Sequence, residues 1–141
     1  MLVVIDLGNG GRKASWLRHS RMLGSAIKPI LEANVLINQL YLREFPQTPL
    51  LYRSGVRYRN EPQGQGFEDF ALIPAIYARG WGDCDDLAPA RVAELRERFS
   101  EPANISILWK RMGGGGKLFH IVVRRADGSI EDPSKLLGMK G

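Results

Sequence analysis

Two apolar segments in the second half of the chain constrain its fold more than any other feature. Residues 104–112 (NISILWKRM) and 117–125 (KLFHIVVRR) are rich in β-branched and aromatic residues, and the glycine run Gly113–Gly116 connects them. Such segments joined by a short flexible connection predict two antiparallel strands. The turn residues ADG (126–128) and the short segment SIEDP (129–133) follow directly. We therefore expect a three-stranded antiparallel sheet.

The length of the ADG turn decides which side chains share a face of this sheet. A two-residue loop, Asp127-Gly128, would place Asp132 on the face away from His120, because side chains alternate along a strand. A three-residue loop over 126–128 places Asp132 opposite Val122, on the face of His120 and one diagonal step away. A type I turn that ends in a left-handed glycine is a common three-residue hairpin, and ADG suits it. We therefore predict this second register.

The segments before these strands are mostly typical of helices. From Pro29 to Glu44 apolar residues recur at helical spacing, with Pro29 in the first turn and Pro46 marking the end. Residues 67–80 are predicted to be helical with an interruption at Pro74. A later helix that ends at Phe99 would bury one apolar face. The residues of that face are Ala88, Val92, Leu95 and Phe99.

Other segments complete an α+β pattern, with helices first and the antiparallel sheet last. LVVID (2–6) predicts a short strand, LLYRSGVRYR (50–59) a strand or extended arm, and NEPQGQG (60–66) a loop. The length of 141 residues suits one domain over 1–141. Within it we distinguish a basic part of unassigned role, 1–54, from a core, 55–136, that carries the motifs described below.

The one cysteine of the chain, Cys84, lies in GWGDCDDLA (80–88), at the start of a predicted helix. Outward-pointing N–H groups and the helix dipole favour a thiolate there. If the helix starts at Asp83, Pro89 lies in its interior at a cost of about 3 kcal/mol. If the helix starts nearer Asp86, Pro89 costs little but Cys84 leaves the helix end. Both alternatives stay open, as does that of a small apolar cysteine in the core.

Charge and cysteine content limit the setting and the partners. Residues 1–60 hold nine Lys and Arg against three Asp and Glu, whereas residues 61–141 hold eleven against twelve. The basic first part is interpreted as a solvated surface, with nucleic acid as a further candidate partner that no motif supports. The single cysteine and the absence of a signal-peptide pattern favour the cytoplasm. No apolar run approaches the length of a membrane span.

The order of three motifs resembles that of the transglutaminase-like cysteine enzymes, a branch of the papain-like fold. These motifs are GDCDDLA (82–88), LFHIVV (118–123) and DGSIEDPS (127–134). VRYRNEP (56–62) also looks like the segment before the cysteine in small bacterial and phage versions. The spacings, 36 residues from Cys84 to His120 and then 12 to Asp132, fit the family order. The resemblance covers residues 55 to 136 and implies a papain-like core.

The resemblance implies a Cys-His-Asp triad. Cys84 would attack a carboxamide or peptide carbonyl and form a thioester, His120 would transfer the proton, and Asp132 would hold the imidazole. The N–H of Cys84 would be one oxyanion donor. The second stays open among four upstream residues: Tyr58, Gln63, Gln65 and Trp81.

No metal or cofactor is implied by the resemblance. The acids beside the cysteine are interpreted as helix-terminal groups that complement the positive end of the dipole, not as a cation site. Asp83 would be the helix cap, with Asp85 and Asp86 in the first turn.

Two functions follow as hypotheses. The first is a cytoplasmic cysteine hydrolase or acyl transferase acting on protein or peptide substrates, with hydrolysis favoured. Protease, amidase, deamidase and cross-linking activities share this chemistry and stay open. The second is a non-catalytic binding or assembly module on the same fold. It would use its basic surface to contact nucleic acid or a protein partner, such as a component of a phage particle.

Overall fold

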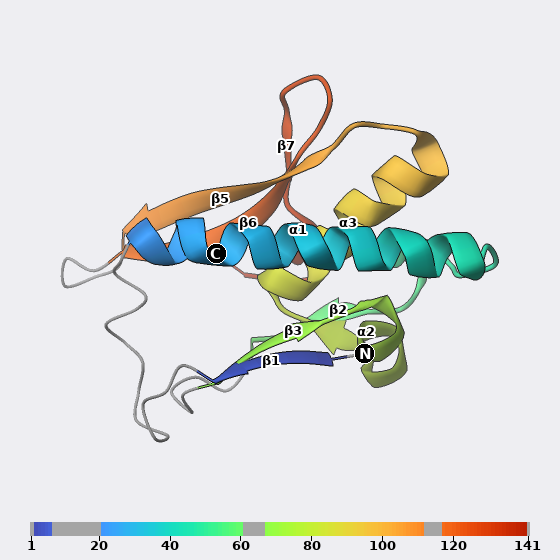
Figure 1. The fold of residues 1–141 in the computed structure, drawn as a ribbon, viewed down its shortest axis with the longest axis horizontal. Coiled ribbons are helices and arrows are strands. Elements are labelled where there is room, and N and C mark those ends of the chain that lie inside the picture. The colour runs from blue at the N-terminus through green and yellow to red at the C-terminus, as the bar shows by residue number, and fades with distance from the viewer. Residues whose placement is uncertain (1, 7–20, 61–66, 112–116, 141) are drawn as a thin grey trace.

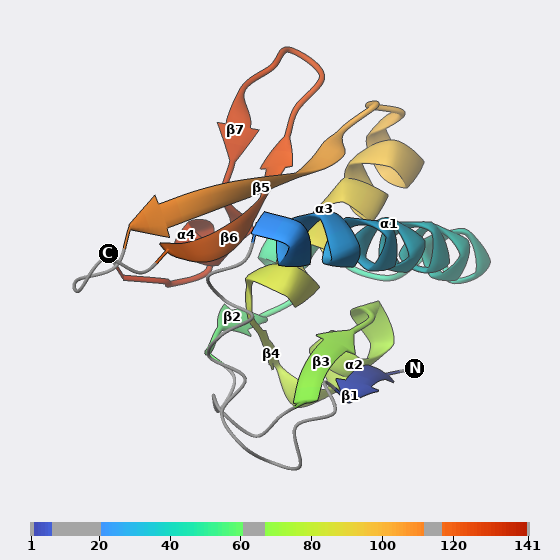
Figure 2. The same cartoon turned by 60° about the vertical axis from the view of Figure 1, so that its left-hand side comes forward.

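Two helices, α1 and α3, lie side by side between a three-stranded sheet and a smaller group of strands (Figure 1; Figure 2). The structure is a computed structural model that describes residues 2–6, 21–60, 67–111 and 117–140. This mixture of helices and small sheets confirms the predicted α+β class. The elements in chain order are β1 (Leu2–Asp6), α1 (Arg21–Glu44), the short 3-10 helix η2 (Leu51–Arg53), β2 (Arg57–Tyr58), β3 (Phe67–Ala71), α2 (Ile73–Arg79), β4 (Trp81–Gly82), α3 (Cys84–Phe99), β5 (Asn104–Arg111), β6 (Lys117–Arg124), β7 (Ile130–Glu131) and α4 (Pro133–Leu136).

The three-stranded sheet has the predicted order and register. β5 pairs antiparallel with β6, and β6 pairs antiparallel with β7. The N–H of Arg125 donates to the carbonyl oxygen of Ser129 at 2.8 Å and closes the three-residue loop, in which Gly128 has a φ of 86°. The prediction of a three-residue ADG turn is therefore confirmed. The glycine run Gly113–Gly116, expected to link β5 to β6, lies outside the described residues.

Helix α1 ends at Glu44, as predicted, but begins at Arg21, so that Pro29 lies in its interior and not in its first turn. The side chains of Ile27, Leu31 and Val35 are buried at intervals of four residues. This buried stripe extends upstream of Pro29, and its packing offsets the helical hydrogen bond that the proline cannot donate. Because Ile27 packs into the core, the helix extends upstream of the start predicted at Pro29.

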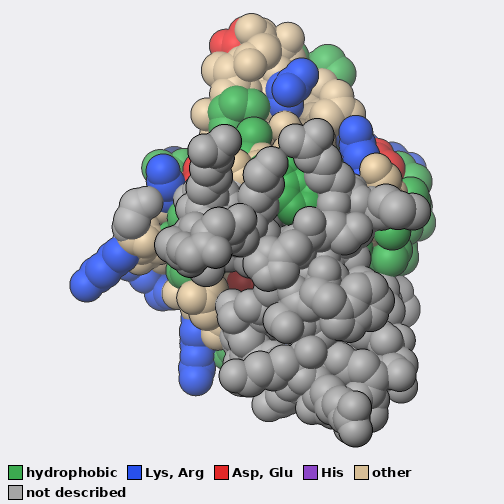
Figure 3. Space-filling view, turned by 90° about the vertical axis from the view of Figure 1, so that its left-hand side faces the viewer, with side chains coloured by type: hydrophobic (Ala, Val, Ile, Leu, Met, Phe, Trp, Pro, Cys, Tyr) green, Lys and Arg blue, Asp and Glu red, His purple; other side chains and the backbone are tan. Residues whose placement is uncertain are grey.

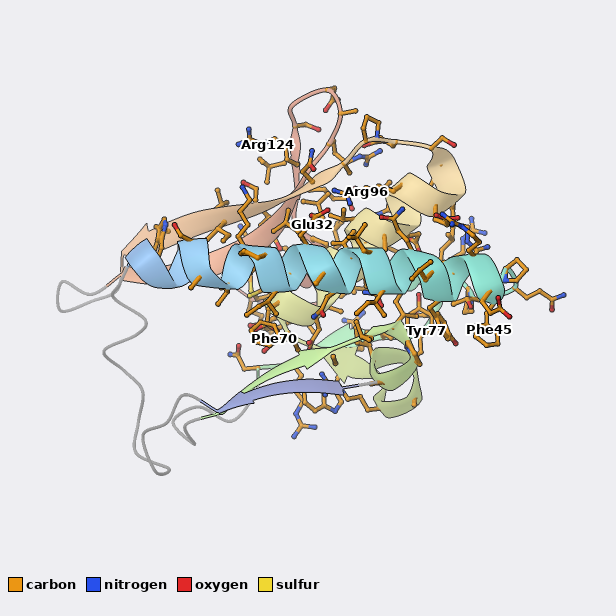
Figure 4. All side chains as sticks on the ribbon, in the orientation of Figure 1. Glu32, Phe45, Phe70, Tyr77, Arg96 and Arg124 are labelled. Atoms are coloured by element: carbon orange, nitrogen blue, oxygen red, sulfur yellow. The ribbon has the colours of Figure 1, made fainter. Side chains whose placement is uncertain are left out.

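Ion pairs between α1 and α3 lie over the buried contact between these helices. Arg96 on α3 donates to Glu32 on α1 at 2.7 Å, and Figure 4 shows the two side chains between their helices. Farther along, Arg43 on α1 donates to Glu97 on α3 at 2.8 Å. Exposed pairs of this kind contribute little each, so the buried apolar contact carries most of the stabilisation.

The apolar face of α3 differs from the predicted one at its end. Three of its four residues are buried, whereas Phe99 is 53% exposed. Glu94, a charged residue of the same helix, is only 1% exposed. Its carboxylate accepts the N–H of Leu51 at 2.7 Å and Arg91 at 2.6 Å. A buried carboxylate needs such partners. Arg91 is three residues away on the same helix, whereas Leu51 comes from a contact that helical periodicity does not reveal. The three buried residues are Ala88, Val92 and Leu95.

The prediction of one interrupted helix over residues 67–80 was wrong. Residues 67–71 form β3, which pairs antiparallel with β1, and the helix begins only at Ile73. Pro74 lies in the first turn of α2, where its missing N–H costs nothing. Pairing with a strand more than sixty residues earlier overrides the local preference, and the predicted strand over 2–6 is that partner.

The segment 50–59 contains less extended chain than predicted. Its first half is the 3-10 helix η2, followed by a turn in which the Ser54 hydroxyl donates to the Leu51 carbonyl at 2.6 Å and Gly55 has a φ of 85°. Only Arg57 and Tyr58 form a strand, β2, which pairs parallel with β4. This pairing places β2 beside the strand that leads into Cys84. Of the predicted loop over 60–66, residues 61–66 lie outside the described residues.

In the described ranges, no helix combines the length and apolarity needed to cross a bilayer. The longest of them, α1, buries its apolar stripe against the rest of the fold.

Gly128→Ala is expected to destabilise the protein, because alanine in the left-handed region costs about 1 to 2 kcal/mol. Space is not the cause, since a Cβ at this position would meet nothing within 4 Å. Urea denaturation should show the loss as a lower unfolding midpoint. Gly128→Asn is the matched control and should lose less, because asparagine tolerates this conformation. Equal loss in both variants would contradict the explanation.

Candidate active site

The imidazole of His120 and the carboxylate of Asp132 meet on one face of the sheet. The β6–β7 register places Asp132 diagonally opposite His120, and His120 Nε2 lies 2.8 Å from Asp132 Oδ2. The other carboxylate oxygen accepts the N–H of Lys135 at 3.3 Å at the start of α4. His120 is 6% exposed, so the pair is shielded from solvent. A carboxylate at Nε2 holds the proton on that nitrogen and leaves Nδ1 as an acceptor.

Cys84 is the first residue of α3, and Asp83 is its N-cap. The helix therefore starts at the earlier of the two predicted positions, and Pro89 lies in its interior. The cysteine is partly exposed, and the backbone of Ile121, the residue after His120, hydrogen-bonds its sulfur. Helix α3 packs on β6 and brings these two positions together.

The side chains of Cys84 and His120 are not hydrogen-bonded to each other in this structure. Although both side chains lie among the described residues, no hydrogen bond joins the Cys84 sulfur to the imidazole. The hydrogen bond from Ile121 places the sulfur beside the backbone of β6 next to His120. The structure therefore unites His120 with Asp132 directly and sets Cys84 next to this pair.

The thiol of Cys84 is held in its neutral form. Burial raises its pKa to about 12, and the charges of Asp83, Asp86 and Asp132 add to this effect, whereas the hydrogen bond from Ile121 opposes it. The expected lowering by the helix dipole is therefore outweighed. Desolvation and like charge both disfavour a thiolate.

The three acids at the start of α3 cluster closely. One oxygen atom from each of Asp83, Asp85 and Asp86 lies within 4.8 Å of the others. Asp86 is already engaged, since it accepts the N–H of Ala71 at 2.6 Å and the guanidinium of Arg79 at 2.7 Å. The guanidinium and the positive helix end both disfavour a further cation.

Asp85 is a poor metal ligand in this cluster, because its surroundings disfavour the charged carboxylate. Burial, followed by the charge of Asp83 and a hydrogen bond to it, raises the pKa of Asp85 well above its ordinary value. Desolvation and a neighbouring like charge both disfavour a buried carboxylate. The trio thus fits a helix-terminal network better than a metal centre.

The candidates for a second oxyanion donor differ in position. The ring of Trp81 is covered by the guanidinium of Arg79, at 3.7 Å, and that of Arg59, at 5.2 Å. The hydroxyl of Tyr58 hydrogen-bonds Asn60. Burial raises the pKa of Tyr58 to about 12, with the charge of Cys84 as the next cause, so this phenol lies near the thiol. The other two candidates, Gln63 and Gln65, lie outside the described residues.

Glu131 also lies beside the candidate site, next to Asp132, although no sequence motif singles it out. Its carboxylate accepts hydrogen bonds from Arg91, Tyr52 and Arg125. Strand alternation alone predicts that the side chains of Glu131 and Asp132 point to opposite faces of the sheet. Its partners on α3 and η2 were not predictable from that signal.

Comparison with known proteins returned no match to a family model, to a curated protein or to a solved structure.

Asp83→Asn is expected to lower the pKa of the Cys84 thiol, because Asp83 carries the carboxylate charge that raises this pKa most after burial. Asparagine is as good an N-cap as aspartate, so the helix start should persist. At about pH 8 the rate of alkylation by iodoacetamide should rise about three- to tenfold, since one pKa unit changes the thiolate fraction tenfold.

Mass spectrometry of the alkylated chain reads out this prediction without ambiguity, because Cys84 is the only cysteine. Asp127→Asn, in the exposed hairpin loop, is the control and should leave the pH profile unchanged. A wild-type profile that levels off below about pH 8.5, the range of an ordinary thiol, would contradict the raised pKa.

Proposed function

We propose that the protein is a cysteine enzyme that takes the acyl group of an amide or peptide onto Cys84 and then passes it to water or an amine. The observation that carries the proposal is the His120–Asp132 hydrogen bond, at 2.8 Å, next to the backbone position that meets the Cys84 sulfur. A helix that begins at the cysteine and packs on the strand of the histidine also supports a papain-like core of the transglutaminase-like type.

The high pKa of the thiol determines how the nucleophile is formed. At pH 7 a thiol with a pKa of about 12 is ionised in about one molecule in 10⁵, so a resting thiolate contributes little. His120 therefore acts as a general base during the attack, with Asp132 keeping its proton on Nε2. Catalytic hydrogen bonds are often long before substrate binds, and the Cys84–His120 contact forms in the substrate complex.

In the first half-reaction, the sulfur of Cys84 forms a bond to the carbonyl carbon while the thiol proton moves to Nδ1 of His120. The carbonyl oxygen becomes an oxyanion. As the first helical residue, Cys84 has an N–H without an acceptor inside the helix, and this N–H donates to the oxyanion. Cleavage of the C–N bond then releases the amine, which takes the proton from His120 and leaves a thioester.

In the second half-reaction, water attacks the thioester and gives a proton to His120. The C–S bond breaks, the sulfur recovers the proton, and a carboxylic acid leaves. An amine in place of water would give a new amide by the same steps. Hydrolysis is our choice, because water needs no further binding site.

Acetylation of the chain by p-nitrophenyl acetate tests this function. The wild-type protein should release a burst of p-nitrophenol and gain one acetyl group on Cys84, whereas Cys84→Ala should show neither. His120→Ala should slow the acylation about 10²- to 10⁴-fold, the usual contribution of a general base. His19→Ala, at the other histidine of the chain, is the matched control and should keep the wild-type rate. An unchanged rate in His120→Ala would refute the proposed role.

Exposed arginines favour a second candidate function, a binding or assembly module. Arg53, Arg57 and Arg59 are all exposed, and none forms an ion pair with another described residue. Other basic side chains also project from the described surface in the view of Figure 3. Such groups would contact the phosphates of a nucleic acid or the acidic surface of a partner protein.

The second candidate makes the opposite prediction for the cysteine. Retention of duplex DNA in a pull-down at low salt should be abolished by charge reversal at Arg53, Arg57 and Arg59 and unaffected by Cys84→Ala. Binding that weakens steeply as salt rises would mark phosphate contacts. Absence of retention at low salt would exclude the nucleic-acid form of this function.

A further inference from the structure

Glu131, the residue before Asp132, is held by side chains from three parts of the chain. Its Oε2 accepts Arg91 Nε of α3 at 2.7 Å and the hydroxyl of Tyr52 of η2 at 2.6 Å. Its Oε1 accepts Arg125 Nη1, across the hairpin loop, at 2.7 Å. We call these four residues, Glu131, Arg91, Tyr52 and Arg125, the Glu131 clamp.

The inner part of the clamp is shielded from water, unlike an ordinary surface ion pair. The side chains of Arg91 and Glu131 are 12% and 13% exposed. Burial raises the pKa of Glu131, but the hydrogen bonds from Arg91 and Tyr52 outweigh it and hold the pKa below its ordinary value. Glu131 is therefore charged at neutral pH. The guanidinium of Arg91 also lies 4.7 Å from the centre of the Tyr52 ring.

The clamp joins the strand of Asp132 to the helix of Cys84. Arg91 follows Cys84 by seven residues, two helical turns along α3. Strand β7 has only two residues paired with β6, so its ladder alone fixes it weakly. The Nη1 of Arg91 also donates a hydrogen bond to the buried Glu94 at 2.6 Å, and this bond anchors the guanidinium to the core.

We propose that Glu131 is a positioning residue. Held by Arg91 and Tyr52, it fixes the backbone at Asp132 relative to α3 and thereby keeps the Asp132 carboxylate on Nε2 of His120. Whether this positioning also promotes catalysis rests on the proposed function. The positional role concerns the His120–Asp132 pair itself and is measurable without any substrate.

The test is the ring tautomer of His120 in Glu131→Gln, read from ¹⁵N NMR of the full chain and assigned with His120→Gln. In spectra of the uncharged ring, the wild-type protein should show the Nε2–H tautomer, because the Asp132 carboxylate lies 2.8 Å from Nε2 and holds that proton. Glutamine keeps the size of the side chain but not its charge, and the variant should show a mixture of both tautomers. The burst rate with p-nitrophenyl acetate should fall about tenfold in parallel.

Glu101→Gln is the matched control. Glu101 accepts two hydrogen bonds from the same Arg125, both at 2.6 Å, and has no recorded contact with Glu131 among the described residues. This variant loses a more exposed ion pair to the same Arg125 and should keep the wild-type tautomer. A merely stabilising role would lower the melting temperatures of both variants and change the tautomer in neither.

The outcomes separate the two proposals. A pure Nε2–H form in a folded Glu131→Gln protein overturns the positioning role. If that variant does not fold, Tyr52→Phe decides, because it removes one hydrogen bond and keeps the ring beneath Arg91. A smaller shift of the tautomer populations in the same direction supports the positioning role, whereas the absence of any shift overturns it. Absence of acylation in the wild-type protein would refute the enzyme but leave the tautomer result intact.

Discussion

The hydrogen bond between His120 and Asp132 depends on the pleat of a β-sheet, in which a one-residue slip reverses the face of every side chain. The three-residue loop fixes this register, and Gly128 makes the loop possible through its φ of 86°. If the loop had two residues, Asp132 would point away from the imidazole and the candidate site would not exist. The packing of α3 on β6 brings Cys84 close to this pair.

The elements that could be predicted from the sequence are those whose signals are local. The hairpin loop, the strands β5 and β6, and the end of α1 at Glu44 each depend on residues within a few positions of one another. The pairing of His120 with Asp132 belongs to this group, because it follows from counting residues along a single turn. The catalytic roles that we propose for these residues come from the resemblance, because the fold by itself does not assign them.

The remaining features depend on partners far along the chain. Residues 67–71 are a strand because β1 lies beside them, and the buried carboxylate of Glu94 accepts the N–H of the distant Leu51. The state of the thiol also belongs here. A helix start predicts a lowered thiol pKa, whereas burial and three carboxylates raise it. Desolvation is a property of the whole packed structure, and no local pattern measures it.

The interval from His120 to Asp132 and the interval from Cys84 to His120 are fixed by different structural elements. The 12 residues from His120 to Asp132 cannot change without altering the turn that joins β6 to β7. The 36 residues from Cys84 to His120 comprise helix α3 and a chain that then passes out along β5 and back along β6. Residues added in pairs at the far end of that ribbon would lengthen it and leave His120 in place. A recognisable relative of this chain should therefore keep the shorter interval, while the longer one can drift by even numbers.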